Sequence, residues 1–251
     1  MGVVLWHIEI SHYNEKARWA LDYKGIPYEL RTPMPGTHRL SALRLTRGRH
    51  DRLPVLGLGG SRIGDSTAII AALEEHTPEP ALYPADPVER ERALELEDFF
   101  DEEVGPRVRR LYWFHTIDDV DAASEVILNN VGTLRRGVMR RLAPIAGRGV
   151  KRDYGIDEAG AAEAADGLRA AMDRLESEIG PSGYLVGDSF SVADLTGAAM
   201  FTSIIAPPER PYAAPLPPPL TEFREELEAR PGGAWIADVY ARHRGAPVPV
   251  A

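Results

Sequence analysis

Four polar side chains stand in a row near the start of the chain: Ser11, His12, Tyr13 and Asn14. They follow VVLWHIEI, a run of β-branched and bulky apolar residues that is typical of a strand. The segment after them spaces its apolar residues at helical intervals. The cluster is therefore predicted to lie at a strand-to-helix turn, a common place for functional side chains. From its position alone, Ser11 is either a plain helix N-cap or a hydrogen-bond donor to a ligand.

A second candidate pair, Asp65 and Ser66, stands where a later helix is predicted to begin. Ser66 has the residue type of an ordinary N-cap. The free amides and positive end of a helix also suit an anion, so both interpretations stay open. The nearby GLGG at 57–60 joins two short apolar runs without opening a helix, which favours a hairpin turn over a dinucleotide loop. We therefore expect no nucleotide cofactor.

Metal and protein-thiol chemistry find little support. The chain has no cysteine, which excludes a disulfide, a cysteine nucleophile and a cysteine metal site. His7 and Glu9 would share one face of a strand, with His12 beyond, but three mixed ligands at a chain reversal are weak support for a metal site. We expect no metal, and we assign these side chains to the structure or to the wall of a pocket.

Size and charge narrow the class of protein. The 251 residues suit two packed domains, and 44% apolar with 27% charged residues indicates a soluble globular protein. The net charge of -9 argues against nucleic acid as the main partner, because phosphate binding needs a basic field. No stretch approaches the roughly 20 apolar residues that span a bilayer. The first residues also lack the pattern of a signal peptide. We expect a cytoplasmic protein.

The order of predicted elements divides the chain into two parts. Strands are predicted at 3–8, 28–31, 53–58 and 61–63, with helices at 12–23, 37–47 and 66–76. Four prolines between 78 and 87 indicate a boundary, with one domain at 1–80 and an all-helical one at 88–251. Ser191 and Asp194 are predicted to form a capping box with Phe190 and Leu195 as its staple, a folding device and not a catalytic pair. The proline-rich 206–219 is predicted to be a rigid link between helices, a more natural role than a ligand for another protein.

Four motifs in this order, EKARWAL after Ser11, RLPVL, GDSTAI and YLVGDSFSVADL, resemble those of the cytosolic glutathione transferase family. The resemblance covers essentially the whole chain and is to the bacterial-type form with serine at the catalytic position. It implies a thioredoxin-like α/β N-terminal domain followed by an all-α C-terminal domain, and a homodimer. It also implies glutathione as co-substrate, transferase activity and a role in detoxification.

The resemblance assigns a role to each matching residue in glutathione binding. Pro54 would follow a cis peptide bond, and Leu53 would offer its backbone N–H and C=O to the cysteinyl part of glutathione. Ser66 would bind the γ-glutamyl carboxylate, and Asp65 the amino group beside it. The glycine carboxylate of glutathione would be bound by a cation that precedes Pro54 in the sequence. The candidates are His38 and Arg39, with Arg49 and Arg52 as rivals.

Ser11 matches the position that faces the glutathione sulfur in this family, where its hydroxyl would donate to the thiolate. Tyr13 is the second choice for that donor. His12 replaces a proline common in the family, and Asn14 stands where redox-active relatives carry a second cysteine, which excludes exchange through a protein dithiol. In the family the acceptor pocket is lined by the first-helix turn and a long helix of the second domain. Here that helix would offer Tyr112, Trp113 and His115.

The leading hypothesis is an enzyme that holds glutathione as thiolate for attack on a small hydrophobic electrophile, by conjugation, reductive dehalogenation or isomerisation. The alternative is a non-catalytic binding or scaffold protein of the same family. One stretch, from Arg135 to Arg152, has seven basic residues and no acid. It is interpreted first as a solvated helix face and loop, and second as a segment that docks on an acidic protein or an anionic membrane.

Overall fold

The computed structural model describes residues 2–34, 36–118, 147–212 and 216–245. Four short strands form one sheet in the order β2-β1-β3-β4: β1 Val3–Trp6, β2 Tyr28–Arg31, β3 Val55–Leu58 and β4 Ser61–Gly64. The β1 and β2 strands are parallel, while β3 runs antiparallel to both β1 and β4. The GLGG segment turns β3 into β4, with Gly59 and Gly60 at φ angles of 57° and 86° that suit glycine. The predicted hairpin is thus confirmed.

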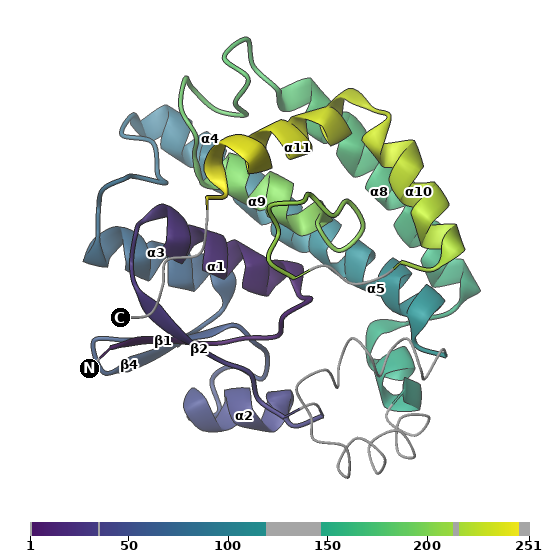
Figure 1. Cartoon of the computed structure of the whole chain (residues 1–251), viewed down its shortest axis with the longest axis horizontal. Helices are drawn as coiled ribbons and strands as arrows, with labels where there is room; N and C mark the ends of the chain where they lie inside the picture. Colours follow the sequence, from purple (N-terminus) through teal and green to yellow (C-terminus); the bar gives the residue numbers. More distant parts are fainter. Residues whose placement is uncertain (1, 35, 119–146, 213–215, 246–251) are drawn as a thin grey trace.

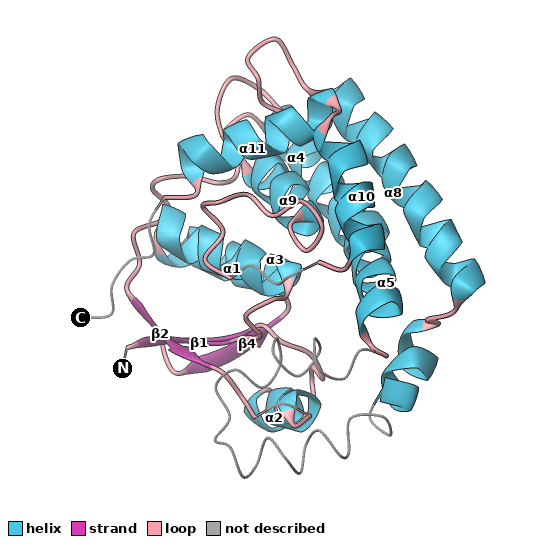
Figure 2. Ribbon diagram, turned by 45° about the vertical axis from the view of Figure 1, so that its right-hand side comes forward, coloured by secondary structure: helices cyan, strands magenta, loops and turns pink. Residues whose placement is uncertain are grey.

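Helices cover both faces of this sheet (Figure 2). Helix α1 His12–Tyr23 and helix α3 Ser66–His76 lie on one face, and the short α2 His38–Leu45 lies on the other. The alternation of side chains along a strand explains the two layers. Leu5 and Leu56 pack with the α1 and α3 side chains in the main core, whereas Trp6 and Val55 pack with α2 in a smaller cluster.

The remainder of the described chain is helical (Figure 1). Helix α4 Pro87–Phe99 continues through a π-helical turn, η1 Phe100–Val104, into α5 Gly105–Thr116, and residues 147–154 are helical. Then follow α8 Glu158–Glu178, α9 Val192–Phe201, α10 Pro218–Glu228 and α11 Pro231–His243. No strand occurs among the described residues after β4. The predicted class, a thioredoxin-like α/β part and a helical C-terminal part, is correct. The exact bounds 1–80 and 88–251 stay a prediction.

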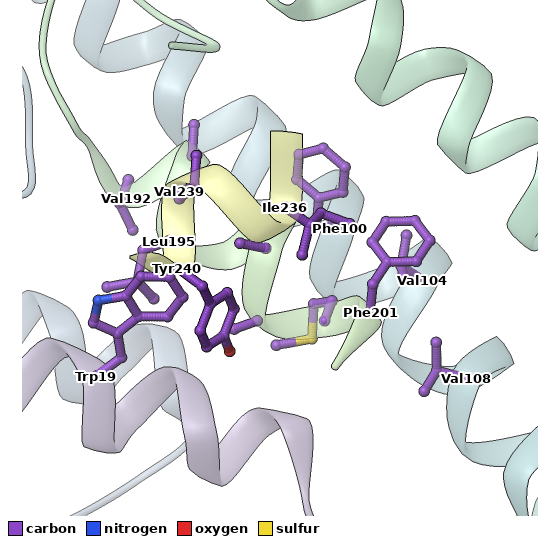
Figure 3. Close-up of a cluster of buried hydrophobic side chains, with 14 of the residues drawn as sticks. Trp19, Phe100, Val104, Val108, Val192, Leu195, Phe201, Ile236, Val239 and Tyr240 are labelled. Carbon is purple, nitrogen blue, oxygen red and sulfur yellow. The ribbon is translucent and has the colours of Figure 1, made fainter. Parts of the chain in front are cut away.

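Trp19 joins the two parts. It projects from α1 against Tyr240 of α11, with ring centroids 4.2 Å apart (Figure 3). Its ring also stacks on that of Phe190, with centroids 5.7 Å apart. Its indole N–H donates to the His243 carbonyl oxygen over 3.0 Å. The surrounding side chains come from α1, α5, α9 and α11, and they include Val108, Phe201 and Ile236. One continuous core therefore fixes the sheet-bearing part against the helices.

The predicted capping box at the start of α9 is present. The Asp194 carboxylate accepts from the Ser191 amide and from the Leu185 amide, both over 2.8 Å. Burial raises the pKa of Asp194 to about 6 against the effect of these donors. The box fixes the direction in which α9 enters the core, and it lies in the helical part with no link to the sulfur chemistry.

No helix in the described ranges has the length and apolar character to cross a membrane. Most of the basic stretch Arg135–Arg152, including its first four arginines, lies outside the described residues. Of the part that is described, Lys151 pairs with Asp118 over 2.6 Å. Docking of this stretch on a membrane or an acidic partner stays a prediction.

Candidate active site

The β3–β4 hairpin brings two of the predicted segments to the same end of the sheet. Val55 pairs with Gly64, so the residues just before β3 lie beside those just after β4. Leu53 and Pro54 thus adjoin Asp65, which begins α3. The peptide bond between Leu53 and Pro54 is cis, as the resemblance implied. Both residues are buried at this edge, below the first turn of α1.

Hydrogen bonds tie the first turns of α1 to these segments. The Asn14 side chain donates to the Leu53 carbonyl oxygen over 3.4 Å and accepts from the Ile8 amide over 3.1 Å. Two positions along, the Lys16 ammonium donates to the Thr67 hydroxyl of α3 over 3.0 Å. The starts of α1 and α3 and the edge at Leu53 therefore converge. Asn14, which departs from the family pattern, contributes to that arrangement.

At the start of α3 the helix cap is Asp65, not Ser66. One Asp65 carboxylate oxygen accepts from the Thr67 and Ala68 amides, over 3.0 and 3.1 Å. Asp65 has a φ of 77°, a conformation that is uncommon for a residue with a side chain and is often found at functional sites. Because Asp65 takes up those two amides, the Ser66 amide and hydroxyl are the donors left in this first turn for an anion.

Ser11 holds the N-cap position of α1 by its backbone, yet its side chain makes no capping hydrogen bond. The main chain provides the turn instead, because the Ser11 amide donates to the Ile8 carbonyl and the Glu15 amide donates to the Ser11 carbonyl. Ser11 is half-buried. Within the described part of the chain, no hydrogen bond of its hydroxyl is found. The Ser11 hydroxyl therefore does not act as a side-chain N-cap, and its role as a hydrogen-bond donor to a ligand stays a prediction.

Two arginines hold the turn that carries Ser11. Arg18, from α1, donates to the Glu9 carbonyl over 3.0 Å, and Arg210, from the link after α9, donates to the Ile10 carbonyl over 2.6 Å. Both guanidinium groups are buried. Arg18 also approaches the His7 ring, whose burial lowers its pKa to about 3, so that His7 is neutral. His7 and Glu9 therefore belong to the support of the turn.

Tyr13 and His12 are committed to other partners. The Tyr13 hydroxyl donates to the Asp101 carbonyl over 2.7 Å, and burial raises the pKa of this phenol. Its Oη would lie 2.2 Å from a Cβ built on Gly105, so the absence of a side chain there makes room for the ring. His12 contacts the Ser203 hydroxyl over 3.3 Å. Burial and the charges of Arg109 and Arg210 hold the pKa of His12 well below its usual value.

The candidates for the glycine carboxylate lie on two sides of Leu53. His38 and Arg39 begin α2 and are exposed, and Arg39 pairs with Asp51 over 3.0 Å. Arg49 donates to the Thr46 carbonyl and is thereby fixed to the end of α2. Arg52 directly precedes Leu53 and points toward the helical part, 5.7 Å from the Tyr154 ring centroid.

A cavity of about 270 Å³ opens between the two parts, and it differs from the predicted acceptor pocket. Its walls include Arg52, Pro106, Arg109, Arg110, Asp153 and Tyr154. Tyr112, Trp113 and His115 are absent from these walls. Tyr112 is buried in the main core and Trp113 packs against that core. The first two turns of α5 contribute Pro106, Arg109 and Arg110 to this cavity. An acceptor pocket at Tyr112, Trp113 and His115 stays a prediction.

The helical period of α5 could have located this face. Its buried positions include Val108, Leu111 and Tyr112, spaced by three and four residues, which mark the core side. Arg109 and Arg110 fall outside that stripe. The four consecutive bulky residues from 112 to 115 suggested a pocket, yet helical spacing already assigns the first of them to the core.

The sheet with its cis-proline edge and the appended helices define a two-domain thioredoxin-like protein. Two sequence models of one family match it, that of the glutathione S-transferase N-terminal domain over residues 5–81 and that of the glutathione S-transferase C-terminal domain over residues 158–229. Together they span more than half of the chain. The chain belongs to the glutathione S-transferase family. A search of curated proteins found no match.

Solved structures of the family share the fold over nearly the whole length. A glutathione S-transferase from Methylobacterium radiotolerans in complex with glutathione sulfonate is 24% identical, with 100% of this chain and 96% of that chain covered and a TM-score of 0.57. A bacterial maleyl pyruvate isomerase of the Zeta class is 22% identical, covers 97% and 96%, and has a TM-score of 0.62. Rice GST1 in complex with glutathione is 18% identical, covers 98% and 91%, and has a TM-score of 0.64. At these identities the likeness shows the fold.

Proposed function

We propose that this protein is a glutathione transferase in which Ser11 donates a hydrogen bond to the glutathione thiolate. The observation that carries the proposal is the Ser11 hydroxyl, which stands at the start of α1 without capping it. The edge at Leu53 would pair with the cysteinyl part of glutathione. Ser66 would bind the γ-glutamyl carboxylate, and the Asp65 carboxylate would accept from the amino group. The thiolate would then attack a small electrophile.

The energetics are within reach of this arrangement. Lowering a thiol pKa by roughly 2 units from about 8.5 requires about 2.7 kcal/mol of preference for the anion. A charge-assisted hydrogen bond contributes about 1.5 to 3 kcal/mol, and a helix N-terminus about 0.3 to 1 kcal/mol more. Ser11 with the positive end of α1 supplies both. His12, which is neutral, adds no charge of its own.

The test is the ionisation of bound glutathione. Ultraviolet absorbance of the thiolate is titrated against pH in the wild type, in Ser11→Ala and in Tyr13→Phe. We expect Ser11→Ala to raise the thiol pKa by about 1 to 2 units and to lower kcat/KM by a similar power of ten. Because the Tyr13 hydroxyl already donates to Asp101, Tyr13→Phe should shift that pKa much less. The reverse order of the two shifts would assign the donor role to Tyr13.

Binding and turnover separate the enzyme from the alternative. Retention on a glutathione column that is lost in Ser66→Ala, together with turnover of an electrophile panel, supports the transferase. Retention without turnover favours the non-catalytic binding or scaffold protein. The proposal also includes a homodimer, a cytoplasmic location and a role in detoxification. The dimer is checked by light scattering of the purified chain.

A further inference from the structure

The cavity between Arg52 and Tyr154 holds more positive charge than the proposed thiol chemistry uses. Three guanidinium groups, of Arg52, Arg109 and Arg110, line it against one carboxylate, that of Asp153. Arg110 is partly neutralised, since it donates to the Tyr154 carbonyl over 3.2 Å and to the Glu163 carboxylate over 3.4 Å. The Arg110 charge is thus paired within the wall of the cavity.

Arg109 is in a different position. It is half-buried, and no carboxylate of the described residues is among the groups that most affect its pKa. Its Nε is buried without a hydrogen-bond partner. Burial lowers the pKa of Arg109, and the charges of Arg52 and Arg110 lower it further. A guanidinium stays protonated even so, and the poorly solvated positive charge of Arg109 therefore faces the cavity.

Tyr154 keeps two of these cations close to each other. The guanidinium carbon of Arg109 lies 4.4 Å from the Tyr154 ring centroid, and that of Arg52 lies 5.7 Å from it. Stacking on an aromatic ring stabilises a guanidinium while it leaves the in-plane N–H donors free. Like charges gathered in this way repel each other, and a bound anion with two acceptor oxygens would relieve the repulsion.

We propose that the acceptor substrate is a small electrophile that carries a carboxylate, bound by Arg109 with Arg52 beside it. This inference rests on the proposed transferase function and names the substrate class of that site. The cavity volume of about 270 Å³ falls just under the range usual for ligand pockets, which limits the acceptor to a small molecule. A purely hydrophobic acceptor would offer the Arg109 charge no partner beyond those of the described residues.

The position of Arg109 favours binding of the acceptor substrate by this residue over binding of glutathione. Arg109 belongs to α5 of the helical part, one turn after Gly105, which lies against the Tyr13 ring. The charge of Arg109 lowers the pKa values of His12 and Tyr13, the two residues after Ser11. His38 and Arg39 of α2 lie on the sheet-bearing part and are exposed there, with Arg39 beside Asp51, and they stay the candidates for the glycine carboxylate. An acceptor with its carboxylate at Arg109 would extend its reacting carbon toward the sulfur near Ser11.

The test uses two acceptors with the same chloronitrophenyl ring, the anion 4-chloro-3-nitrobenzoate and its neutral methyl ester. In both reactions the glutathione sulfur bonds to the carbon that bears chlorine. The carbon–chlorine bond breaks, chloride leaves with the electron pair, and the thiol proton goes to solvent. Each enzymatic kcat/KM is divided by the uncatalysed rate constant of the same acceptor, because the ester is intrinsically more reactive. The preference is the ratio of these quotients, acid over ester.

The wild type should prefer the acid, and Arg109→Met should lower that preference by about 10- to 100-fold, the range of one charge-assisted hydrogen bond. Arg109→Lys should recover part of it. Arg107→Met is the matched control, since Arg107 lies on the same helix and pairs with Glu103. Its preference should equal that of the wild type. The half-saturating glutathione concentration should not change in Arg109→Met.

Each other outcome overturns the inference. An unchanged preference with weaker glutathione binding would place the glycine carboxylate of glutathione at Arg109. An unchanged preference with unchanged glutathione binding would make the arginines structural. If neither acceptor turns over, the proposed function fails separately. In that case, calorimetry measures the binding of 3-nitrobenzoate to the glutathione-saturated wild type and to Arg109→Met. Equal affinity of the two proteins, or no binding by the wild type, would refute the carboxylate site at Arg109. Thermal unfolding of each variant confirms that it is folded.

Discussion

The buried ion cluster under the Ser11 turn makes the clearest prediction about stability, through the change Glu15→Gln. Glu15 is fully buried. Its carboxylate accepts from Arg18 over 2.8 Å and from Arg244 over 2.5 Å. Burial alone would raise the pKa of Glu15, but Arg18, Arg244 and Arg210 outweigh it and lower that pKa. The residue is therefore charged at neutral pH, and its neutral isostere removes the charge without a cavity.

The expected loss is large because two guanidinium groups would lose their shared partner. Removing one side of a buried ion pair costs about 3 to 5 kcal/mol. Asp22 still pairs with Arg244 over 2.8 Å, which favours the lower half of that range. In a chain of this size each kcal/mol lowers Tm by about 2 to 4 °C, so we expect a fall of roughly 6 to 16 °C.

Denaturant unfolding followed by circular dichroism measures this loss, with thermal unfolding alongside. The matched control is Glu226→Gln, whose carboxylate pairs with Arg169 over 2.6 Å on the surface. An exposed pair of that kind contributes at most about 1 kcal/mol. If Glu15→Gln lost no more free energy of unfolding than Glu226→Gln, the cluster would not be what holds the turn. Loosening of Arg18 should also weaken glutathione binding, since Arg18 holds the Glu9 carbonyl.

Two further predictions concern the same region. Because His7 has a pKa of about 3 when folded and an ordinary one near 6.5 when unfolded, the unfolded chain binds more protons between those values. Stability is therefore full above pH 6.5 and falls with acid, by about 2 kcal/mol from His7 alone at pH 5. His7→Asn should flatten the free energy of unfolding plotted against pH over 5 to 6.5, and an unaltered slope would contradict the assignment. Gly105→Ala would place a Cβ 2.2 Å from the Tyr13 hydroxyl, so it should destabilise the chain by about 1 to 3 kcal/mol. Tyr13→Leu removes the hydroxyl and also the ring carbons that would lie 2.5 and 3.1 Å from that Cβ. Gly105→Ala combined with Tyr13→Leu should therefore cost less than the sum of the two single changes, and additive costs would show that the clash lies elsewhere.

Local signals were enough for most of the fold. The spacing of 3.6 residues predicted a helix over 12–23, the bounds that α1 has, and the run 28–31 was predicted as the strand that is observed. The capping box at Ser191 and the GLGG hairpin depend on residue types within a few positions of each other, and both were predicted correctly. The first strand ends at Trp6, earlier than predicted, because the residues after it turn to begin the Ser11 segment.

The partners of the buried charges could not be predicted from one sequence. Glu15, Lys16 and Arg18 look like the solvated face of an amphipathic helix, yet all three are buried. Their compensation comes from far along the chain, from Glu97 for Lys16 and from Arg244 for Glu15. The cavity between Arg52 and Tyr154 likewise could not be predicted from local sequence. Its cations come from a loop before β3 and from α5, and only the packing of the two parts brings them together.

These buried charges explain how Ser11 can be free for chemistry. A serine at the start of a helix normally spends its hydroxyl on a backbone amide, and leaving that bond unmade costs about 1 kcal/mol. Here the carbonyls of the preceding turn are held by Arg18 and Arg210, whose charge-assisted hydrogen bonds are stronger than a neutral cap. Because Arg210 comes from the helical part, the turn is set only when both parts are packed. The availability of the Ser11 hydroxyl is thus a property of the whole fold and not of the short motif around it.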